Sequence, residues 1–117
     1  MRNSKILIAA SAAILGFATA AHAQAWGAVG VGPGGAWGWS VGHWSGDEAV
    51  NSMQGYCEWD CDNVHTFVNS CGAIAISSSG AWGFAARDNE EWAREVSVFL
   101  CEDHGRDCWV EVSACAF

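Results

Sequence analysis

The chain repeats part of its own sequence, and this internal repeat constrains the fold more than any other feature. Residues 27–29 (Gly-Ala-Val) recur as residues 72–74 (Gly-Ala-Ile) at an offset of 45 residues. Residues 35–39 (Gly-Ala-Trp-Gly-Trp) recur as residues 80–84 (Gly-Ala-Trp-Gly-Phe) at the same offset. At an offset of 44 residues, the further matches are Ala49 with Ala93 and Cys57 with Cys101. Two copies are too few for a solenoid, so we predict one globule with pseudo-two-fold symmetry.

The N-terminal segment is typical of a cleavable export signal. Arg2 and Lys5 precede an apolar run, and Ala21-His22-Ala23 supplies the small-x-small pattern of a cleavage site. The apolar run is shorter than the roughly 20 residues that span a bilayer, which favours cleavage over a membrane anchor. We therefore expect residues 1–23 to be removed and residues 24–117 to fold as one domain. This domain is expected in the periplasm or outside the cell, without a membrane anchor.

The charge balance excludes some classes of partner. The part after the signal keeps three of the five basic residues and all 13 acidic residues, so its net charge is about −10. Because contacts with DNA, RNA and anionic membranes depend on Lys and Arg, we expect no nucleic-acid or membrane partner. The acidic surface leaves a cationic partner open, although charge of this kind also serves solubility.

Each half has the pattern of two strands, a helix and a third strand. The halves are residues 25–71 and 72–117. The strands expected before the helices cover residues 27–32, 36–42, 72–77 and 81–87, and the third strands cover residues 64–69 and 109–113. Turn residues separate the first two strands of each half. The predicted class is α+β, with an antiparallel sheet and two helices packed on one face.

The helix starts are marked by capping signals. Ser45 and Glu48 form a capping box, and Asp88 and Glu91 form the aspartate version of it. After each cap, apolar residues recur at helical spacing, and Gly105 is a good terminator for the second helix.

Six cysteines follow the predicted signal, and a small exported domain needs covalent support for its core. We therefore expect three disulfides, which allow fifteen connectivities. The pairing favoured by symmetry is Cys57–Cys61, Cys101–Cys108 and Cys71–Cys115. The first two pairs join each helix end to the next strand, and the last pair joins strand ends that the pseudo-two-fold axis relates. A Cys61–Cys71 bond is disfavoured, because ten residues of strand span about 33 Å.

On these residues the sequence resembles a secreted bacterial family named domain of unknown function 4189. The resemblance lies in the doubled Gly-Ala and Gly-Ala-Trp-Gly motifs and in the junction from Cys61 to Ala73, and it covers about residues 25–115. It implies export and this repeated fold, and it brings no catalytic residues. Cys108 and Cys115 are closer together than Cys61 and Cys71, which predicts a shorter final strand.

No residue pattern identifies catalytic or metal chemistry. Asp60-Cys61-Asp62 and Glu102-Asp103-His104 carry ligand atoms at equivalent places, but they lack the spacing of a zinc or calcium site. The run Ser77–Gly80 lies in a turn and is not a nucleophile elbow. Paired carboxylates such as Glu58 and Asp60 fit helix-end charges better than glycoside hydrolysis. We predict no catalytic residues, no metal and no cofactor.

The eight tryptophans are the most informative feature for function. Four of them occupy repeat-matched or helical-stripe positions, so we expect them in the core: Trp37, Trp82, Trp92 and Trp109. The other four are the candidate exposed binding residues: Trp39, Trp44, Trp26 and Trp59. Exposed Trp in an exported protein typically contacts a protein or stacks on a sugar ring, although such rings can also simply cover a Gly-rich sheet.

Three functions follow from these observations. The first is a non-enzymatic interaction module for an unknown protein partner, with self-association as one form of it. The second is a cell-wall or glycan-binding protein that stacks sugars on Trp39 and Trp44. The third is a small hydrolase, which would need two convergent carboxylates in a cleft.

Overall fold

The strands of the two halves form two separate three-stranded antiparallel sheets. The computed structural model describes residues 24–117, so the predicted export signal lies outside the described residues. The elements of the first half are β1 (Trp26–Val31), a short 3-10 turn (Pro33–Gly35), β2 (Trp37–His43), α2 (Gly46–Tyr56) and β3 (Asn63–Val68). The elements of the second half are β4 (Ser70–Ile76), β5 (Trp82–Arg87), α3 (Glu90–Glu102) and β6 (Trp109–Ala116). The α+β class and the β-β-α-β order of both halves are confirmed.

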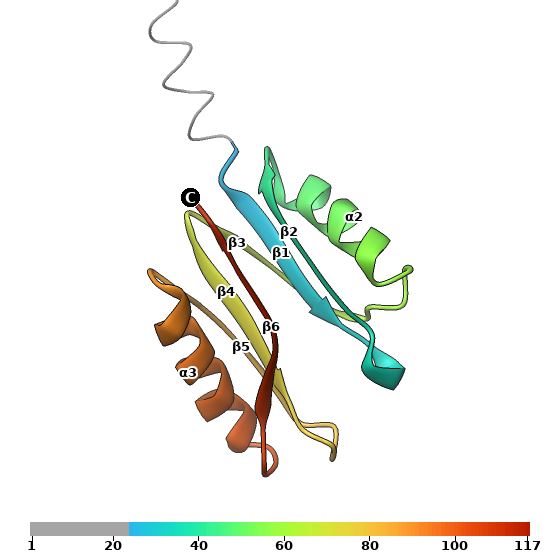
Figure 1. Cartoon of the computed structure of the whole chain (residues 1–117), viewed down its shortest axis with the longest axis vertical. Coiled ribbons are helices and arrows are strands. Elements are labelled where there is room, and N and C mark those ends of the chain that lie inside the picture. Colours follow the sequence, from blue (N-terminus) through green and yellow to red (C-terminus); the bar gives the residue numbers. More distant parts are fainter. Residues whose placement is uncertain (1–23) are drawn as a thin grey trace, which may run out of the picture.

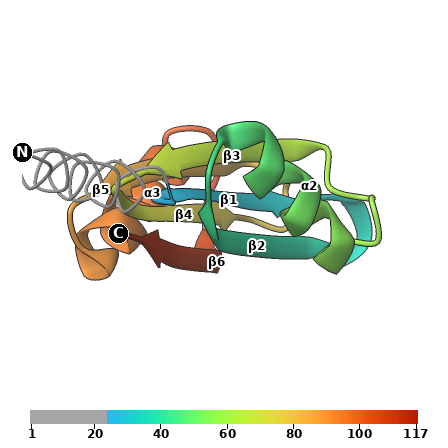
Figure 2. The ribbon, with the colours of Figure 1, turned by 90° about the horizontal axis from the view of Figure 1, so that it is seen from above.

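The two sheets pack face to face, and each helix covers the outer face of its own sheet (Figure 1). The strand orders are β2-β1-β3 and β5-β4-β6. Viewed from above, β1 lies beside β4 and β6, and β2 lies beside β6 (Figure 2). On the other side, His65 of β3 contacts Trp82 and Phe84 of β5. The structure thus refines the expected arrangement: the strands divide between two sheets, and the helices lie on opposite sides of the molecule. Each central strand then has both faces covered.

The central strand β1 shows how the sequence produces these layers. Successive side chains of a strand point to opposite faces. Val29 and Val31 point toward the second sheet and join the core between the sheets. Ala28 points the other way and packs against Met53 of α2. Small residues on the outer face allow the helix to approach closely, and β4 repeats the pattern with Ile74 inward and Ala73 outward.

The first repeated motif has a packing role between the sheets. Gly27 and Gly72 are equivalent, and both lie against the ring of Phe67. A Cβ atom would lie 2.7 Å from this ring at Gly27 and 2.5 Å from it at Gly72. Because only glycine leaves this space, the ring fills the centre of the molecule and is 4% exposed.

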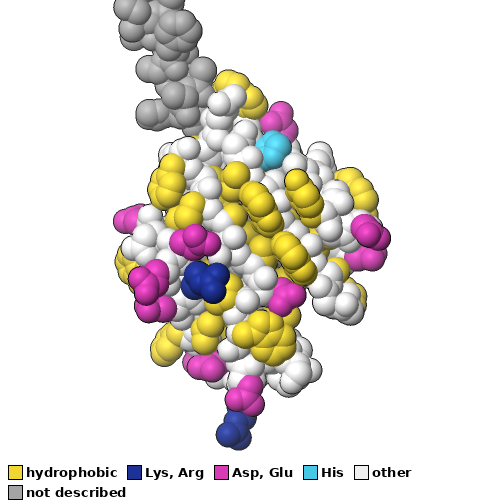
Figure 3. Space-filling model, in the orientation of Figure 1, with side chains coloured by type: hydrophobic (Ala, Val, Ile, Leu, Met, Phe, Trp, Pro, Cys, Tyr) yellow, Lys and Arg dark blue, Asp and Glu magenta, His cyan; other side chains and the backbone are white. Residues whose placement is uncertain are grey.

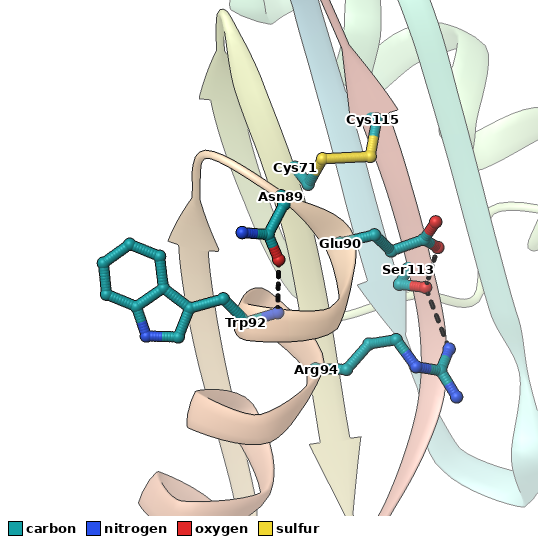
Figure 4. Close-up of a disulfide and its surroundings, with 7 residues drawn as sticks. All are labelled: Cys71, Asn89, Glu90, Trp92, Arg94, Ser113 and Cys115. Atoms are coloured by element: carbon teal, nitrogen blue, oxygen red, sulfur yellow. Dashed lines mark hydrogen bonds between the residues drawn. A yellow bond between two sulfur atoms is a disulfide. The ribbon is translucent and has the colours of Figure 1, made fainter.

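The helix starts agree with the capping prediction in one half and correct it in the other. The Ser45 hydroxyl accepts a hydrogen bond from the Glu48 N–H at 3.2 Å, as predicted. In the second half the cap is Asn89 and not Asp88, and its side chain accepts from the Trp92 N–H at 2.8 Å (Figure 4). Asn89, the residue after the expected cap Asp88, has the extended backbone that a cap needs.

The structure contains the three disulfides that were expected, Cys57–Cys61, Cys101–Cys108 and Cys71–Cys115. The symmetry argument for the last pair was wrong, however. Cys71 lies in β4 opposite Cys115 of β6, so this bond joins two neighbouring strands of the second half (Figure 4). The equivalent position in the first half is the Trp26 and Val68 pair. The boundary between the halves therefore falls near Asn69, and not after Cys71.

The last strand also differs from its prediction. β6 has eight residues and β3 has six, so the final strand is longer and not shorter than its counterpart. A register irregularity near Ile74 accommodates the different length. Within residues 24–117, no helix has the length and apolar character needed to cross a membrane.

Candidate functional site

Most tryptophans lie on the surface. Seven of the eight expose between 40% and 66% of their area, and they are Trp37, Trp39, Trp44, Trp59, Trp82, Trp92 and Trp109. The expectation that four of these rings belong to the core was therefore wrong. The reason is that, apart from Phe67, the core positions are occupied mainly by small or aliphatic side chains, which allow the layers to pack closely. Repeat equivalence indicates that two residues share an environment, but not that this environment is buried.

The edge strand β2 shows how two of these rings reach the surface. Gly38 and Ser40 face α2: a Cβ on Gly38 would meet the Met53 carbonyl at 2.7 Å, and Ser40 donates to the Ala49 carbonyl at 2.6 Å. Trp37 and Trp39 alternate with them and so project from the opposite face. Because β2 is an edge strand, its rings are only partly covered by the neighbouring sheet. On the face that carries β2 and β6, hydrophobic side chains gather in a central band with acidic groups at its margins (Figure 3).

Two recesses lie beside the C-terminal ends of the helices. We call the one beside β2 the β2 hollow. It has a volume of about 580 Å³ and is lined by Trp37, Trp39, Tyr56, Glu58 and Asp60, together with the 33–36 turn. The rings of Trp39 and Tyr56 are parallel to within 1°, with centroids 6.3 Å apart. The hollow thus combines three aromatic rings with two carboxylates at the end of α2.

The second recess, the β5 hollow, has a volume of about 740 Å³. Its aromatic wall consists of Trp82, Phe84 and His65, and its rim includes Asp103 and His104. The His65 ring stacks on Phe84 with centroids 4.5 Å apart and also contacts Trp82. Burial lowers the pKa of His65 below its usual value of 6.5, which favours a neutral ring at pH 7.

The two hollows are related by the internal repeat. Trp37 corresponds to Trp82 and Trp39 to Phe84, at the offset of 45 residues, and Tyr56 corresponds to Leu100 at the offset of 44 residues. Each hollow lies between an edge strand and the C-terminal end of a helix. They differ in polar groups: the β2 hollow has two carboxylates, and the β5 hollow has one carboxylate and two histidines.

The carboxylates of the β2 hollow belong to a constrained loop closed by the Cys57–Cys61 disulfide. Glu58 and Trp59 have φ values of 53° and 64°, in the left-handed region that non-glycine residues rarely adopt. Gly32 leaves no room for a Cβ beside the Asp60 carbonyl oxygen, so the loop packs directly on the chain at the start of the Pro33–Gly35 turn. The disulfide and this close contact hold Glu58 and Asp60 in place.

The four predicted binding residues do not form one site. Trp39 lines the β2 hollow, and Trp59 is exposed in the adjacent disulfide loop. Trp44 is exposed beyond the end of β2, next to the α2 cap, and shares no hollow with Trp39. Trp26 is half-buried, because its ring packs against Gly46 at the start of α2. The expected pairing of Trp39 with Trp44 is therefore replaced by Trp39 with Trp37 and Tyr56.

Sequence reasoning missed several lining residues. Tyr56, Phe84 and His65 were not singled out as binding residues, although Phe84 corresponds to Trp39 in the repeat and Tyr56 corresponds to Leu100. The two acidic turns, considered as metal ligands and set aside, contribute Asp60 to one hollow and Asp103 with His104 to the other. Within residues 24–117, no three His, Cys, Asp or Glu side chains gather as the ligands of a metal ion would.

Fold and surface together define a small disulfide-stapled α+β domain of two similar halves that presents aromatic rings in two related hollows. The family model described as Domain of unknown function (DUF4189) matches residues 26–115, which is nearly the whole described domain. The chain belongs to this family. Comparison with curated proteins and with solved structures finds no match.

Proposed function

We propose that the protein is an exported, non-enzymatic interaction module that binds its partner through the rings of the β2 and β5 hollows. The observation that carries this proposal is the exposure of seven tryptophans, each by 40% or more. Large aromatic side chains supply most of the binding energy at protein interfaces, and exposing so many of them is otherwise unfavourable.

The cysteines support a binding role in an exported protein. All six are paired, so none offers a thiolate nucleophile. Three disulfides in a domain of this size are compatible with an oxidising compartment such as the periplasm or the extracellular space. The disulfides also fix the ends of both helices, and these ends form one side of each hollow.

Affinity capture from the exported fraction tests the proposal. The oxidised protein should retain a partner that the Trp37→Ala, Trp82→Ala double variant retains at least about tenfold less, because each replacement removes one interfacial aromatic anchor. Trp92→Ala is the matched control, since Trp92 is exposed on α3 but lines neither hollow. Equal retention by all three proteins would exclude the hollows as the binding surface.

Saccharide binding is a second candidate, and the β5 hollow favours it. Trp82, Phe84 and His65 form an aromatic wall, while Ser79 and Asp103 provide polar groups at the rim. Sugar rings stack on aromatic faces and hydrogen-bond to such groups. Peptidoglycan fragments should then change the tryptophan fluorescence of the native protein but not that of the Trp82→Ala variant. An unchanged spectrum of the native protein at saturating fragment would eliminate this candidate.

A further inference from the structure

We infer that the β2 hollow binds an arginine or lysine side chain that projects from a cationic protein partner. This inference rests on the proposed function and specifies the chemistry of one of its two hollows. It follows from three properties of the hollow: aromatic faces, carboxylates without a basic residue nearby in the sequence, and a rigid supporting loop.

The aromatic faces are open to a ligand. Trp37, Trp39 and Tyr56 are exposed by 47%, 40% and 68%, and the last two rings are parallel. A guanidinium or ammonium group is attracted to the face of such rings, most strongly to Trp. The chain itself contains one such contact, with the Arg87 guanidinium 5.3 Å from the ring centroid of Trp92.

The carboxylates of Glu58 and Asp60 are exposed beside these rings and add negative charge. The sequence from residue 24 to residue 71 contains no Lys and no Arg, so the first half offers them no ammonium or guanidinium partner. Two arginines of the second half contact groups of that half: Arg87 lies over Trp92, and Arg94 donates to Ser113. The hollow therefore has the charge of a receptor for a cation supplied by another molecule.

The supporting loop fixes the backbone that carries the carboxylates before binding. The Cys57–Cys61 disulfide and the contact of Asp60 with Gly32 restrain both residues, so little conformational entropy remains to be lost. A neutral sugar would use the same rings and could donate hydrogen bonds to the carboxylates, but their negative charge would not attract it. A cationic side chain uses both features, and this makes it the preferred occupant.

The experiment is an NMR titration of the oxidised protein, purified from the exported fraction, with a glycine-spaced arginine peptide. The indole N–H signals of Trp37 and Trp39 should shift. The matched citrulline peptide, which keeps the shape but loses the charge, should bind about tenfold more weakly. Added salt should weaken binding of the arginine peptide, because salt screens the attraction between the peptide and the exposed carboxylates.

Variants in the two hollows locate the site. Binding of the arginine peptide should be about five- to tenfold weaker in the Trp37→Ala variant, and also in the Glu58→Gln, Asp60→Asn double variant. Their counterparts in the β5 hollow, Trp82→Ala and Asp103→Asn, should leave its affinity unchanged. Unchanged spectra outside the mutated hollow show that each variant retains the fold.

Several results would overturn the inference. Undetectable binding of the arginine peptide, equal affinity for the citrulline peptide, or equal loss on Trp82→Ala would each do so. A response of Trp37 and Trp39 to peptidoglycan fragments without a response to arginine would assign the hollow to a glycan. A concentration-dependent mass abolished by Trp37→Ala would assign it to a second copy of the chain. In all these cases the capture experiment above still decides the proposed function separately.

Discussion

Removal of the Cys71–Cys115 disulfide by the Cys71→Ala, Cys115→Ala double replacement should lower the free energy of unfolding by about 4 kcal/mol. The bond joins cysteines 44 residues apart, so it closes a loop that contains nearly all of the second half. A long closed loop restricts the unfolded chain strongly, and its loss raises the entropy of that state. Chemical denaturation of the oxidised proteins, monitored by tryptophan fluorescence, measures the difference.

The Cys57→Ala, Cys61→Ala double variant is the matched control for loop length. Its cysteines are only 4 residues apart, so the same argument predicts a smaller loss, of about 2 kcal/mol. Equal losses in the two double variants would show that loop closure does not account for the stabilisation. The Cys57→Ala, Cys61→Ala replacement should also release the loop that holds Glu58 and Asp60. Binding of the arginine peptide should therefore be weaker in this variant than in the Cys71→Ala, Cys115→Ala variant.

Gly83→Ala should destabilise the protein by about 3 kcal/mol. A Cβ atom at this position would lie 2.5 Å from both the Ser97 carbonyl oxygen and the Cys101 nitrogen. Both are backbone atoms of α3, so the clash is relieved only if the helix moves away from β5. Thermal and chemical denaturation measure the effect, and the signals of Trp82 and Phe84 should shift with the strand.

Gly55→Ala is the opposite control. Gly55 lies in the last turn of α2, and an added Cβ would meet no side chain or other element within 4 Å. Because alanine is the better helix former, this variant should gain about 0.5 to 1 kcal/mol. If Gly83→Ala cost no more than about 0.5 kcal/mol, the close approach of α3 to β5 would be wrong.

The repeated Gly-Ala-Trp-Gly motif has two structural roles. Gly83 and its counterpart Gly38 occur in the repeated Gly-Ala-Trp-Gly motif because each lets a helix rest on an edge strand. The tryptophan of the same motif alternates with the glycine, so it projects to the other face. One motif thus specifies both the helix contact and the exposed ring of each hollow.

The disulfides mark the limit of symmetry reasoning. Cys57–Cys61 and Cys101–Cys108 could be predicted because each joins the end of a helix to the next strand within one half. Cys71 was assigned to the first half, whereas it belongs to β4 and faces Cys115 across the sheet. The Cys71–Cys115 pair was predicted correctly because only these two cysteines remained after the other pairs were assigned. How the two strands bring them together depends on strand register, which the repeat does not specify.

By itself, the sequence determined the duplicated β-β-α-β order, because turn residues, caps and apolar periodicity act locally. It also indicated which cysteines form the three disulfides. Only the tertiary structure decided that the strands form two sheets, and that Trp37 and Trp82 are exposed while Phe67 is buried. The physical reason is that burial depends on what packs over a strand. All three residues lie on edge strands, but the Phe67 ring fills the space that Gly27 and Gly72 leave between the sheets, whereas the rings of Trp37 and Trp82 are only partly covered.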